Sequence, residues 1–405
     1  MLSVMFFRSK RVYLDYAAAT PVRKEIKKAI QAYFDVDFAN PSAIHKEGVR
    51  ARRAVEKARL AVARSVGARP EDVIFTASGT ESNNLALFGV CESVNQSGVA
   101  YDDMEIITTA IEHPSVSAVI EILKAKGVTV KYIPLDETGQ VIVSEIKSLL
   151  TPKTILVTVA YVNSEIGVVQ PISAISRVIK AFEKDYSNKI VFHVDGAQAP
   201  LWLSCHINSL KSDLLSLDAG KCYGPKGVGI LIKRHGVDVS PYIYGGGQEN
   251  NIRSGTENTP LIVGASLALV AAQQNYQARA DRVSLLRDGL IEKLLKIEGV
   301  VLNGSPEKRV ANNVNVSVAG VPSEFAVVSL DEVGFAIATK SACSGATGGG
   351  SAVIRHIYND DLRAETTLRI TLGEDTTKRE LDNFFDALKK HIEETRVSHS
   401  FLTKS

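Results

Sequence analysis

The sequence predicts an α/β protein built on a mainly parallel β-sheet, and three observations support this fold class. Apolar runs of strand length alternate with amphipathic helical patterns from about Val73 to Ile232, which is typical of a parallel sheet covered on both faces by helices. Polar residues follow several of these runs, and sites in such sheets form at the carboxyl ends of the strands. The chain of 405 residues also exceeds the usual size of one hydrophobic core, so a second, smaller domain is expected.

Six apolar runs are predicted to be strands, with helices between several of them. The expected strands are 73–76, 105–109, 129–133, 154–160, 191–195 and 229–232. Helices are expected over 115–126, which ends at Gly127, and over 172–185. Residues 46–66 form a long basic, alanine-rich helical pattern, and we interpret it as a solvent-exposed face rather than a binding patch.

The pattern changes after the glycine-rich stretch at 245–247. A helix rich in Ala and Leu is expected from about Pro260, and another over about 278–297. Shorter strands and helices follow. This change predicts a second α/β domain that begins near residue 275.

Composition argues against several classes of function. The net charge of +2 gives no electrostatic case for binding nucleic acid or a membrane surface. No apolar run approaches the length of a transmembrane helix, and the apolar segment 1–7 is too short for the core of a signal peptide. The cysteines (Cys91, Cys205, Cys222 and Cys343) contain no CxxC pair, which favours a reducing cytoplasm.

Asp195 and Lys221 are the most informative pair of residues. Asp195 ends an expected strand, and Lys221 stands 26 residues later (221 − 195), before a turn rich in Gly and Pro. Pyridoxal phosphate requires a lysine for its Schiff base and a carboxylate that keeps its pyridine nitrogen protonated. The pair therefore predicts a pyridoxal phosphate site and chemistry at the Cα of an amino acid.

Three further segments place polar groups at expected strand ends, and each also has a simpler explanation. Gly79 and Thr80 begin a helix whose N–H groups and Thr80 hydroxyl suit a phosphate, although an ordinary N-cap gives the same pattern. His113 suits stacking on a planar cofactor and proton transfer, or simple helix capping. Asn163 suits a hydrogen bond to a phenolate or carboxylate, or a turn.

Cys343 and Arg369 are the candidates in the second half of the chain. Cys343 lies among small, polar and flexible residues, which is typical of a mobile loop where a thiol acts as a nucleophile once deprotonated. The other three cysteines are interpreted as structural. Arg369 interrupts an apolar, strand-like run. Its guanidinium therefore needs an anion, either a substrate carboxylate or an internal salt-bridge partner.

Together these segments resemble the cysteine desulfurases of the class-V aminotransferase superfamily, in the group with the longer catalytic-cysteine loop. The motifs that carry the resemblance span nearly the whole chain, at 14–21, 40–45, 80–84, 163–167, 193–195, 223–227, 253–256 and 341–343. The resemblance implies a fold-type I homodimer whose large, pyridoxal phosphate-binding domain, residues 21–275, contains a mainly parallel seven-stranded sheet. It also implies a smaller C-terminal α/β domain, residues 276–405, with which residues 1–20 pack.

The resemblance further implies roles for the residues around the cofactor ring. Lys221 would form the Schiff base, and Asp195 would pair with the pyridine nitrogen. Gln198 would contact the phenolic oxygen, and His113 would stack on the ring. No metal is implied.

The phosphate and the substrate have their own implied contacts. Gly79 and Thr80 would hold the phosphate, together with Thr256 of the partner subunit. Asn163 would contact the cofactor and, with Arg369, would bind the substrate carboxylate.

The implied reaction converts L-cysteine to L-alanine. The Lys221 amine would remove the α-proton, and the Cys343 thiolate would attack the substrate sulfur and become a persulfide. A sulfur-acceptor protein would then carry the sulfur to iron–sulfur cluster assembly or tRNA thiolation. Two alternatives stay open: a selenocysteine lyase or related lyase or aminotransferase, and a non-catalytic sulfur-transfer scaffold.

The chain departs from the family pattern at several positions. Asp218 and Gly220 stand where the family has serine and histidine, and an aspartate there would face the cofactor phosphate. Lys340 replaces a glycine near Cys343, where it either lowers the thiol pKa or is merely exposed. Gly348-Gly349-Gly350 predicts a more mobile loop, and Gln248 replaces a histidine with no consequence that we assign.

Overall fold

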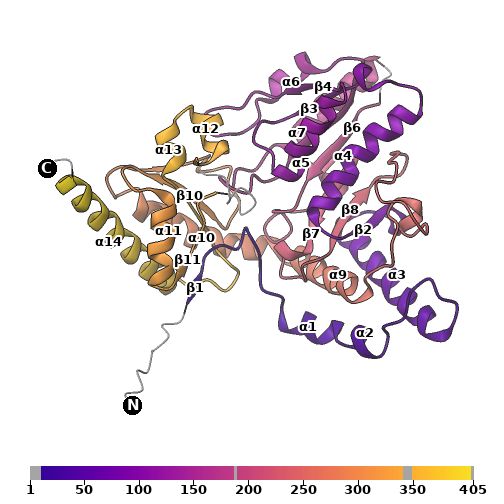
Figure 1. The fold of residues 1–405 in the computed structure, drawn as a ribbon, viewed down its shortest axis with the longest axis horizontal. Coiled ribbons are helices and arrows are strands. Elements are labelled where there is room, and N and C mark those ends of the chain that lie inside the picture. Colours follow the sequence, from indigo (N-terminus) through magenta and orange to yellow (C-terminus); the bar gives the residue numbers. More distant parts are fainter. Residues whose placement is uncertain (1–10, 187–188, 341–348, 403–405) are drawn as a thin grey trace. The chain divides into compact units, whose positions relative to one another are not determined.

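The computed structural model describes residues 11–186, 189–340 and 349–402. The chain divides into two compact units, drawn in Figure 1. The large unit comprises Ala19–Ser164 and Val168–Arg279, and the small unit comprises Met1–Ala18, Glu165–Gly167 and Ala280–Ser405.

The large unit is built on a seven-stranded sheet with the order β2-β8-β7-β6-β5-β3-β4. Its strands are β2 (Val73–Thr76), β3 (Glu105–Thr108), β4 (Thr129–Tyr132), β5 (Thr154–Ala160), β6 (Val191–Asp195), β7 (Leu214–Asp218) and β8 (Gly229–Lys233). Six of these strands run in one direction, and β8 runs in the opposite direction, antiparallel to β2 and β7. The expected α/β fold with a mainly parallel, seven-stranded sheet is therefore confirmed.

One of these strands, β7, is missing from the six that the sequence pattern predicts. It lies between β6 and β8 near the middle of the sheet. Ser216 interrupts its apolar run, and its hydroxyl lies 2.9 Å from Nε2 of the buried His193. A serine that pairs inside the core weakens the apolar signal of a five-residue strand, which explains the omission.

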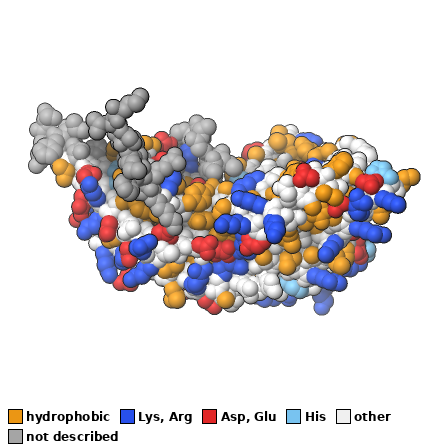
Figure 2. All heavy atoms as spheres, turned by 90° about the horizontal axis from the view of Figure 1, so that it is seen from below, with side chains coloured by type: hydrophobic (Ala, Val, Ile, Leu, Met, Phe, Trp, Pro, Cys, Tyr) orange, Lys and Arg blue, Asp and Glu red, His pale blue; other side chains and the backbone are white. Residues whose placement is uncertain are grey.

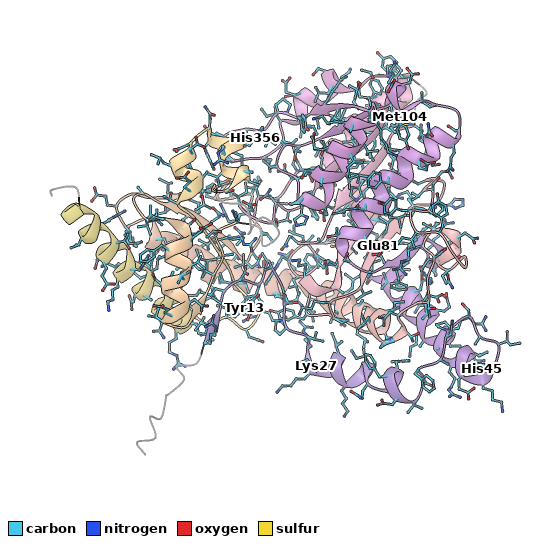
Figure 3. The ribbon with its side chains drawn as sticks, in the orientation of Figure 1. Tyr13, Lys27, His45, Glu81, Met104 and His356 are labelled. Carbon is cyan, nitrogen blue, oxygen red and sulfur yellow. The ribbon has the colours of Figure 1, made fainter. Side chains whose placement is uncertain are left out.

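Helices cover both faces of this sheet. Successive β5 residues Leu156 and Val157 point to opposite faces, and both are fully buried. The helices of the large unit are α1 (Lys24–Ile30), α2 (Ala32–Asp35), α3 (Lys46–Val66), α4 (Gly79–Gln96), α5 (Pro114–Ala125), α6 (Val143–Leu149), α7 (Ile172–Tyr186), α8 (Ile207–Leu210) and α9 (Thr259–Gln274). Short 3₁₀ turns lie at Pro70–Asp72, Tyr101–Asp103, Ala219–Lys221 and Glu249–Asn251. Side chains of α4 and α5 form an apolar core with the sheet, which includes Met104, labelled in Figure 3.

The small unit holds two further sheets. β1 (Val12–Tyr13) pairs in parallel with β11 (Phe335–Ala336). The other sheet is antiparallel, in the order β12 (Thr367–Thr371), β10 (Asn313–Val318) and β9 (Val300–Leu302). The helices are α11 (Ser323–Glu332), α12 (Ala352–Tyr358), α13 (Asp361–Glu365) and α14 (Lys378–Leu402), and α10 (Tyr276–Leu294) begins in the large unit.

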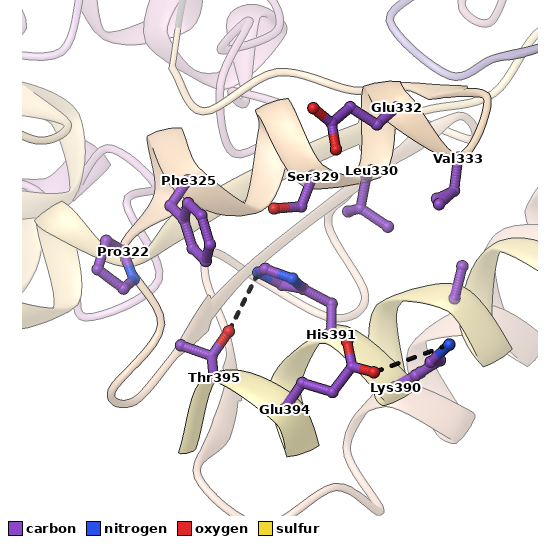
Figure 4. A pocket seen from close by; sticks show the side chains of 11 residues that line it. Pro322, Phe325, Ser329, Leu330, Glu332, Val333, Lys390, His391, Glu394 and Thr395 are labelled. Atoms are coloured by element: carbon purple, nitrogen blue, oxygen red, sulfur yellow. Dashed lines mark hydrogen bonds and ion pairs between the residues drawn. The ribbon is translucent and has the colours of Figure 1, made fainter. Parts of the chain in front are cut away.

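A groove of about 550 Å³ lies between α11 and α14 of the small unit (Figure 4). Phe325 and His391 line it, with ring centroids 5.3 Å apart. None of the described residues that line the groove is a predicted site residue.

Basic and acidic side chains are both scattered over the face in Figure 2. Among the described residues, no helix is long and apolar enough to cross a membrane.

Candidate active site

Seven of the predicted site residues lie at or after the carboxyl ends of strands in the large unit. They are Gly79 and Thr80 after β2, His113 after β3, Asn163 after β5, Asp195 and Gln198 at and after β6, and Lys221 after β7. These five strands run in the same direction, because β2 and β7 are both antiparallel to β8. The residues therefore gather along one edge of the sheet.

Asp195 ends β6 with its carboxylate buried and firmly oriented. The residue is 7% exposed. Its Oδ2 accepts a hydrogen bond of 2.8 Å from Nδ2 of Asn83, and its Oδ1 accepts one of 3.0 Å from the N–H of Ala197. Both donors are neutral, and a buried carboxylate is stabilised by a cationic partner. A protonated pyridine nitrogen would supply that partner, so this position fits pyridoxal phosphate.

Asn83 also links Asp195 to His113 through Ser115. Its Nδ2 donates to Ser115 Oγ at 2.8 Å, and that oxygen lies 2.8 Å from Nδ1 of His113. The N–H of Ser115 donates to the same nitrogen at 3.1 Å. Nδ1 is therefore an acceptor, and the neutral ring carries its proton on Nε2. His113 is thus the N-cap of α5, the simpler role considered for it, and the capping fixes its tautomer.

A second histidine, His193, lies in β6 two residues before Asp195. Its Nδ1 is 2.8 Å from Thr158 Oγ1 and its Nε2 is 2.9 Å from Ser216 Oγ. Complete burial lowers its pKa to about 4. The ring is therefore neutral at physiological pH and places no charge in the core beside Asp195.

Thr20 shapes the loop that carries Lys221. Lys221 ends a 3₁₀ turn, and Tyr223 follows with a φ of 64°, a left-handed conformation that bulky residues rarely adopt. Thr20 Oγ1 donates to the carbonyl of Gly220 at 2.9 Å and accepts from the N–H of Tyr223 at 2.7 Å. The two hydrogen bonds hold both sides of the lysine in this strained turn.

Asn163 and Glu112 complete the buried part of this edge. Asn163 is 4% exposed and donates to the carbonyl of Ile111 at 2.9 Å. The Oε1 of Glu112 accepts from Thr109 Oγ1 at 2.6 Å and from the N–H of Ala160 at 3.2 Å. Burial raises the pKa of Glu112 to about 8. At neutral pH this carboxyl is therefore largely protonated and adds little negative charge beside His113.

Asp218 contacts the predicted phosphate-binding turn. Its Oδ2 accepts from the N–H of Gly79 at 3.4 Å, and its Oδ1 accepts from the N–H of Gly220 at 2.8 Å. The N-cap of α4 is Ser78, whose Oγ accepts from the N–H of Glu81 at 3.1 Å. The ordinary N-cap, which was the simpler explanation for this segment, is therefore present.

Thr256 lies on an exposed loop of the large unit. Three residues earlier, Arg253 Nε donates to Oε1 of Glu81 at 2.8 Å. Glu81, labelled in Figure 3, belongs to the first turn of α4. This ion pair anchors the loop to the same helix that carries Gly79 and Thr80.

In the small unit, Arg369 forms an ion pair with Asp15. Arg369 is 1% exposed in β12, and its Nη2 lies 2.8 Å from Asp15 Oδ1. Asp15 is therefore an anionic partner of Arg369, and the internal salt bridge considered above is present. Lys340 is only 6% exposed, so the expectation of a merely exposed lysine is wrong. Cys343 lies outside the described residues.

Glu165 fixes Ser351, which lies shortly after the cysteine segment in the sequence. Ser351 Oγ donates to Glu165 Oε2 at 2.6 Å and accepts from the N–H of Ile354 at 3.1 Å as the N-cap of α12. Asn313 and Asn315 each donate to the carbonyl of Glu165 at 3.0 Å. Glu165 thus ties α12 to the segment Glu165–Gly167 within the small unit.

The three other cysteines are buried. Burial raises the pKa of Cys91 and of Cys222 to about 12, and it also raises the pKa of Cys205. Their thiols are therefore protonated at physiological pH, and their structural interpretation is confirmed.

The site residues predicted from the sequence do not include Asn83, Ser115, Thr20 or Glu165. Asn83 had one available signal, because it is a polar residue on an otherwise apolar face of α4. Thr20 lies in the motif at 14–21, but its contact with Gly220 spans 200 residues (220 − 20), and only the fold brings the two together.

The comparisons with known proteins agree on one family. The family profile for class-V aminotransferases matches residues 12–384. A protein named cysteine desulfurase IscS from Dictyoglomus turgidum is 39% identical over 389 residues, which cover 96% of this chain and 96% of the relative. Cysteine desulfurase IscS 1 of Archaeoglobus fulgidus is 37% identical over 384 residues, which cover 95% of this chain and 97% of the relative.

Solved structures agree with this assignment. A structure described as a NifS-like protein superposes with a TM-score of 0.87 at 32% identity and covers 95% of this chain and 99% of its own. SspA in complex with cysteine superposes with a TM-score of 0.76 at 33% identity and covers 90% of this chain and 100% of its own.

Proposed function

Because this chain belongs to the class-V aminotransferase family, we propose that it is a pyridoxal phosphate-dependent cysteine desulfurase. It converts L-cysteine to L-alanine and holds the released sulfur as a persulfide. The observation that carries the proposal is the buried carboxylate of Asp195, oriented by Asn83 at the same sheet edge from which the Lys221 loop leaves. Relatives named cysteine desulfurase support the choice of reaction.

When bound, pyridoxal phosphate supplies an electron sink that stabilises negative charge at the substrate Cα. Asp195 would keep the pyridine nitrogen protonated, and Lys221 would hold the cofactor covalently. His113, with its proton on Nε2, would cover the ring, and Gln198 would contact the phenolic oxygen. Gly79 and Thr80 would hold the phosphate with Thr256 of the partner subunit, so the proposed active unit is a homodimer.

Substrate binding uses two polar side chains. Arg369 would match a carboxylate with its planar guanidinium, whose Nη2 also contacts Asp15. Asn163 is held by the carbonyl of Ile111 and contacts both cofactor and substrate. Lys221 takes the α-proton as the general base.

Sulfur transfer requires Cys343 as the nucleophile. Its thiolate attacks the substrate sulfur, a sulfur–sulfur bond forms and the Cβ–S bond breaks. The electron pair of the broken bond would stay with Cβ, which takes up a proton, and the α-proton would return to Cα to give L-alanine. The persulfide then passes its outer sulfur to an acceptor protein for iron–sulfur cluster assembly or tRNA thiolation. We place this activity in the cytoplasm, away from nucleic acid and membranes.

The test combines a spectrum with product assays. Protein reconstituted with pyridoxal phosphate should show the absorption band of the bound cofactor, release alanine from L-cysteine, and release sulfide when a thiol reductant is present. Lys221→Ala should lose both the covalent band and alanine formation. Alanine release that survives Cys343→Ala undiminished would favour a selenocysteine lyase or related lyase, and absence of cofactor binding would favour a scaffold.

A further inference from the structure

Asp218 places a carboxylate against the first residue of α4. Its Oδ2 accepts from the N–H of Gly79. A Cβ added to Gly79 would lie 3.1 Å from the Cβ of Asp218 and 3.2 Å from its Oδ2. The aspartate therefore fills the space directly beside the start of this helix.

This position favours a negative charge. α4 spans Gly79–Gln96, and the N–H groups and dipole at the start of such a helix attract anions. The Asp218 carboxylate accepts from Gly79 and Gly220, and both of these donors are neutral backbone N–H groups. An anionic side chain thus takes the place that the proposed function gives to an anionic phosphate.

Gly220 is matched to this arrangement. The bond from its N–H to Asp218 Oδ1 closes a turn over two residues. A Cβ on Gly220 would lie 3.1 Å from that same oxygen, which is closer than ordinary van der Waals contact. Lys226 packs beside Gly220, but its Nζ donates to the carbonyl of Thr20. The two departures from the family pattern, Asp218 and Gly220, are therefore one structural feature.

We infer that Asp218 is a built-in competitor of the cofactor phosphate. This inference rests on the proposed function, because it assumes that pyridoxal phosphate binds at this edge. To bind, the phosphate must displace the carboxylate from Gly79 or lie beside it, and two anions in contact repel each other. The phosphate group therefore contributes little to cofactor affinity here, and the Schiff base with Lys221 and the ion pair with Asp195 contribute most.

The inference is tested by comparing pyridoxal phosphate with pyridoxal, which lacks the phosphate. Dissociation constants for both are measured on the cofactor-free protein by absorbance titration. In the wild type we expect the two constants to differ by less than about tenfold. Asp218→Asn keeps the acceptor oxygen and removes the charge, so it should tighten pyridoxal phosphate binding at least tenfold and change pyridoxal binding less than threefold. Asp218→Ser/Gly220→His, which restores the family pattern, should behave in the same way.

A second readout needs no cofactor. Inorganic phosphate should raise the melting temperature of cofactor-free Asp218→Ser more than that of the wild type, at matched ionic strength, because the helix start is then open to an anion. A wild-type protein that prefers pyridoxal phosphate over pyridoxal by a thousandfold would overturn the inference, as would an Asp218→Asn variant with unchanged preference. If neither pyridoxal phosphate nor pyridoxal gives the absorption band of a Schiff base with Lys221, the proposed function itself fails. The two failures are therefore distinguishable.

Discussion

Asn83 donates a hydrogen bond of 2.8 Å to the carboxylate of Asp195 and, from the same nitrogen, one of 2.8 Å to Ser115. Ser115 in turn contacts Nδ1 of His113. A single amide on α4 therefore orients both the carboxylate proposed to face the pyridine nitrogen and the imidazole proposed to cover the ring. We regard Asn83 as a positioning residue of this site.

Replacement of Asn83 should weaken cofactor binding. A hydrogen bond to a charged group contributes about 1.5–3 kcal/mol, so Asn83→Ala should raise the dissociation constant for pyridoxal phosphate by roughly tenfold to a hundredfold. The absorption maximum of the bound cofactor should also shift, because Asp195 loses its orientation. Asn84→Ala is the control, since Asn84 donates to the carbonyls of Thr80 and Ser115 rather than to Asp195. Equal effects of the two variants would remove Asn83 from this role.

Thr20 should matter for the stability of the large unit. Thr20→Val keeps the shape of the side chain but leaves the N–H of Tyr223 and the carbonyl of Gly220 without the hydroxyl partner. We expect the free energy of unfolding to fall by roughly 1–3 kcal/mol, measured by denaturant unfolding. Thr20→Ser retains the hydroxyl and should lose less. A Thr20→Val protein as stable as the wild type would show that the lysine loop holds its conformation by other contacts.

Glu112 should make stability depend on pH. Burial raises its pKa to about 8 in the folded protein, whereas an unfolded glutamate titrates near 4.3. The folded state therefore holds the proton more tightly. Its stabilising contribution is complete below about pH 4 and disappears as pH rises through about 8, with a slope of up to about 1.4 kcal/mol per pH unit.

Glu112→Gln should remove this slope because an amide does not titrate. Its carbonyl oxygen can still accept from Thr109 and Ala160. The measurement is the free energy of unfolding of both proteins between about pH 5 and 8.5. Glu121→Gln changes an exposed glutamate on α5 and should leave the slope intact. If Glu112→Gln retains the wild-type slope, some other group carries the pH dependence.

The thiols should react unequally. Cys91, Cys205 and Cys222 are buried with raised pKa values, so they should resist a thiol reagent in the native protein. We expect one fast-reacting thiol per chain, and Cys343→Ala should abolish it. Fast labelling that persists in Cys343→Ala would show that another cysteine is accessible.

The sequence alone was sufficient for the fold class and for the residues at the strand ends. Apolar runs predicted six of the seven strands of the large sheet, and Asp195 and His113 stand at and after the ends of two of them. Lys221 follows β7, the strand that the pattern missed. The contacts that orient them were not predictable. Asn83 and Thr20 act across 112 and 200 residues of chain, to Asp195 and Gly220, and local patterns carry no information about such pairings.

The departure at Asp218 was visible in the sequence, but its consequence was not. Only the structure brings its carboxylate to the N–H of Gly79 at the start of α4. The same holds for Arg369, because only the structure brings Asp15 to within 2.8 Å of its guanidinium.

In the proposed reaction, this chain removes sulfur from cysteine and holds it on Cys343. The most direct measurement is a single turnover with L-cysteine in the absence of any acceptor or reductant, followed by quantification of alanine and mass analysis of the Cys343 peptide. We expect one alanine per chain and the mass of one added sulfur atom on that peptide, with both lost in Lys221→Ala. Alanine without sulfur on Cys343, or sulfur on Cys343 without Lys221, would contradict it.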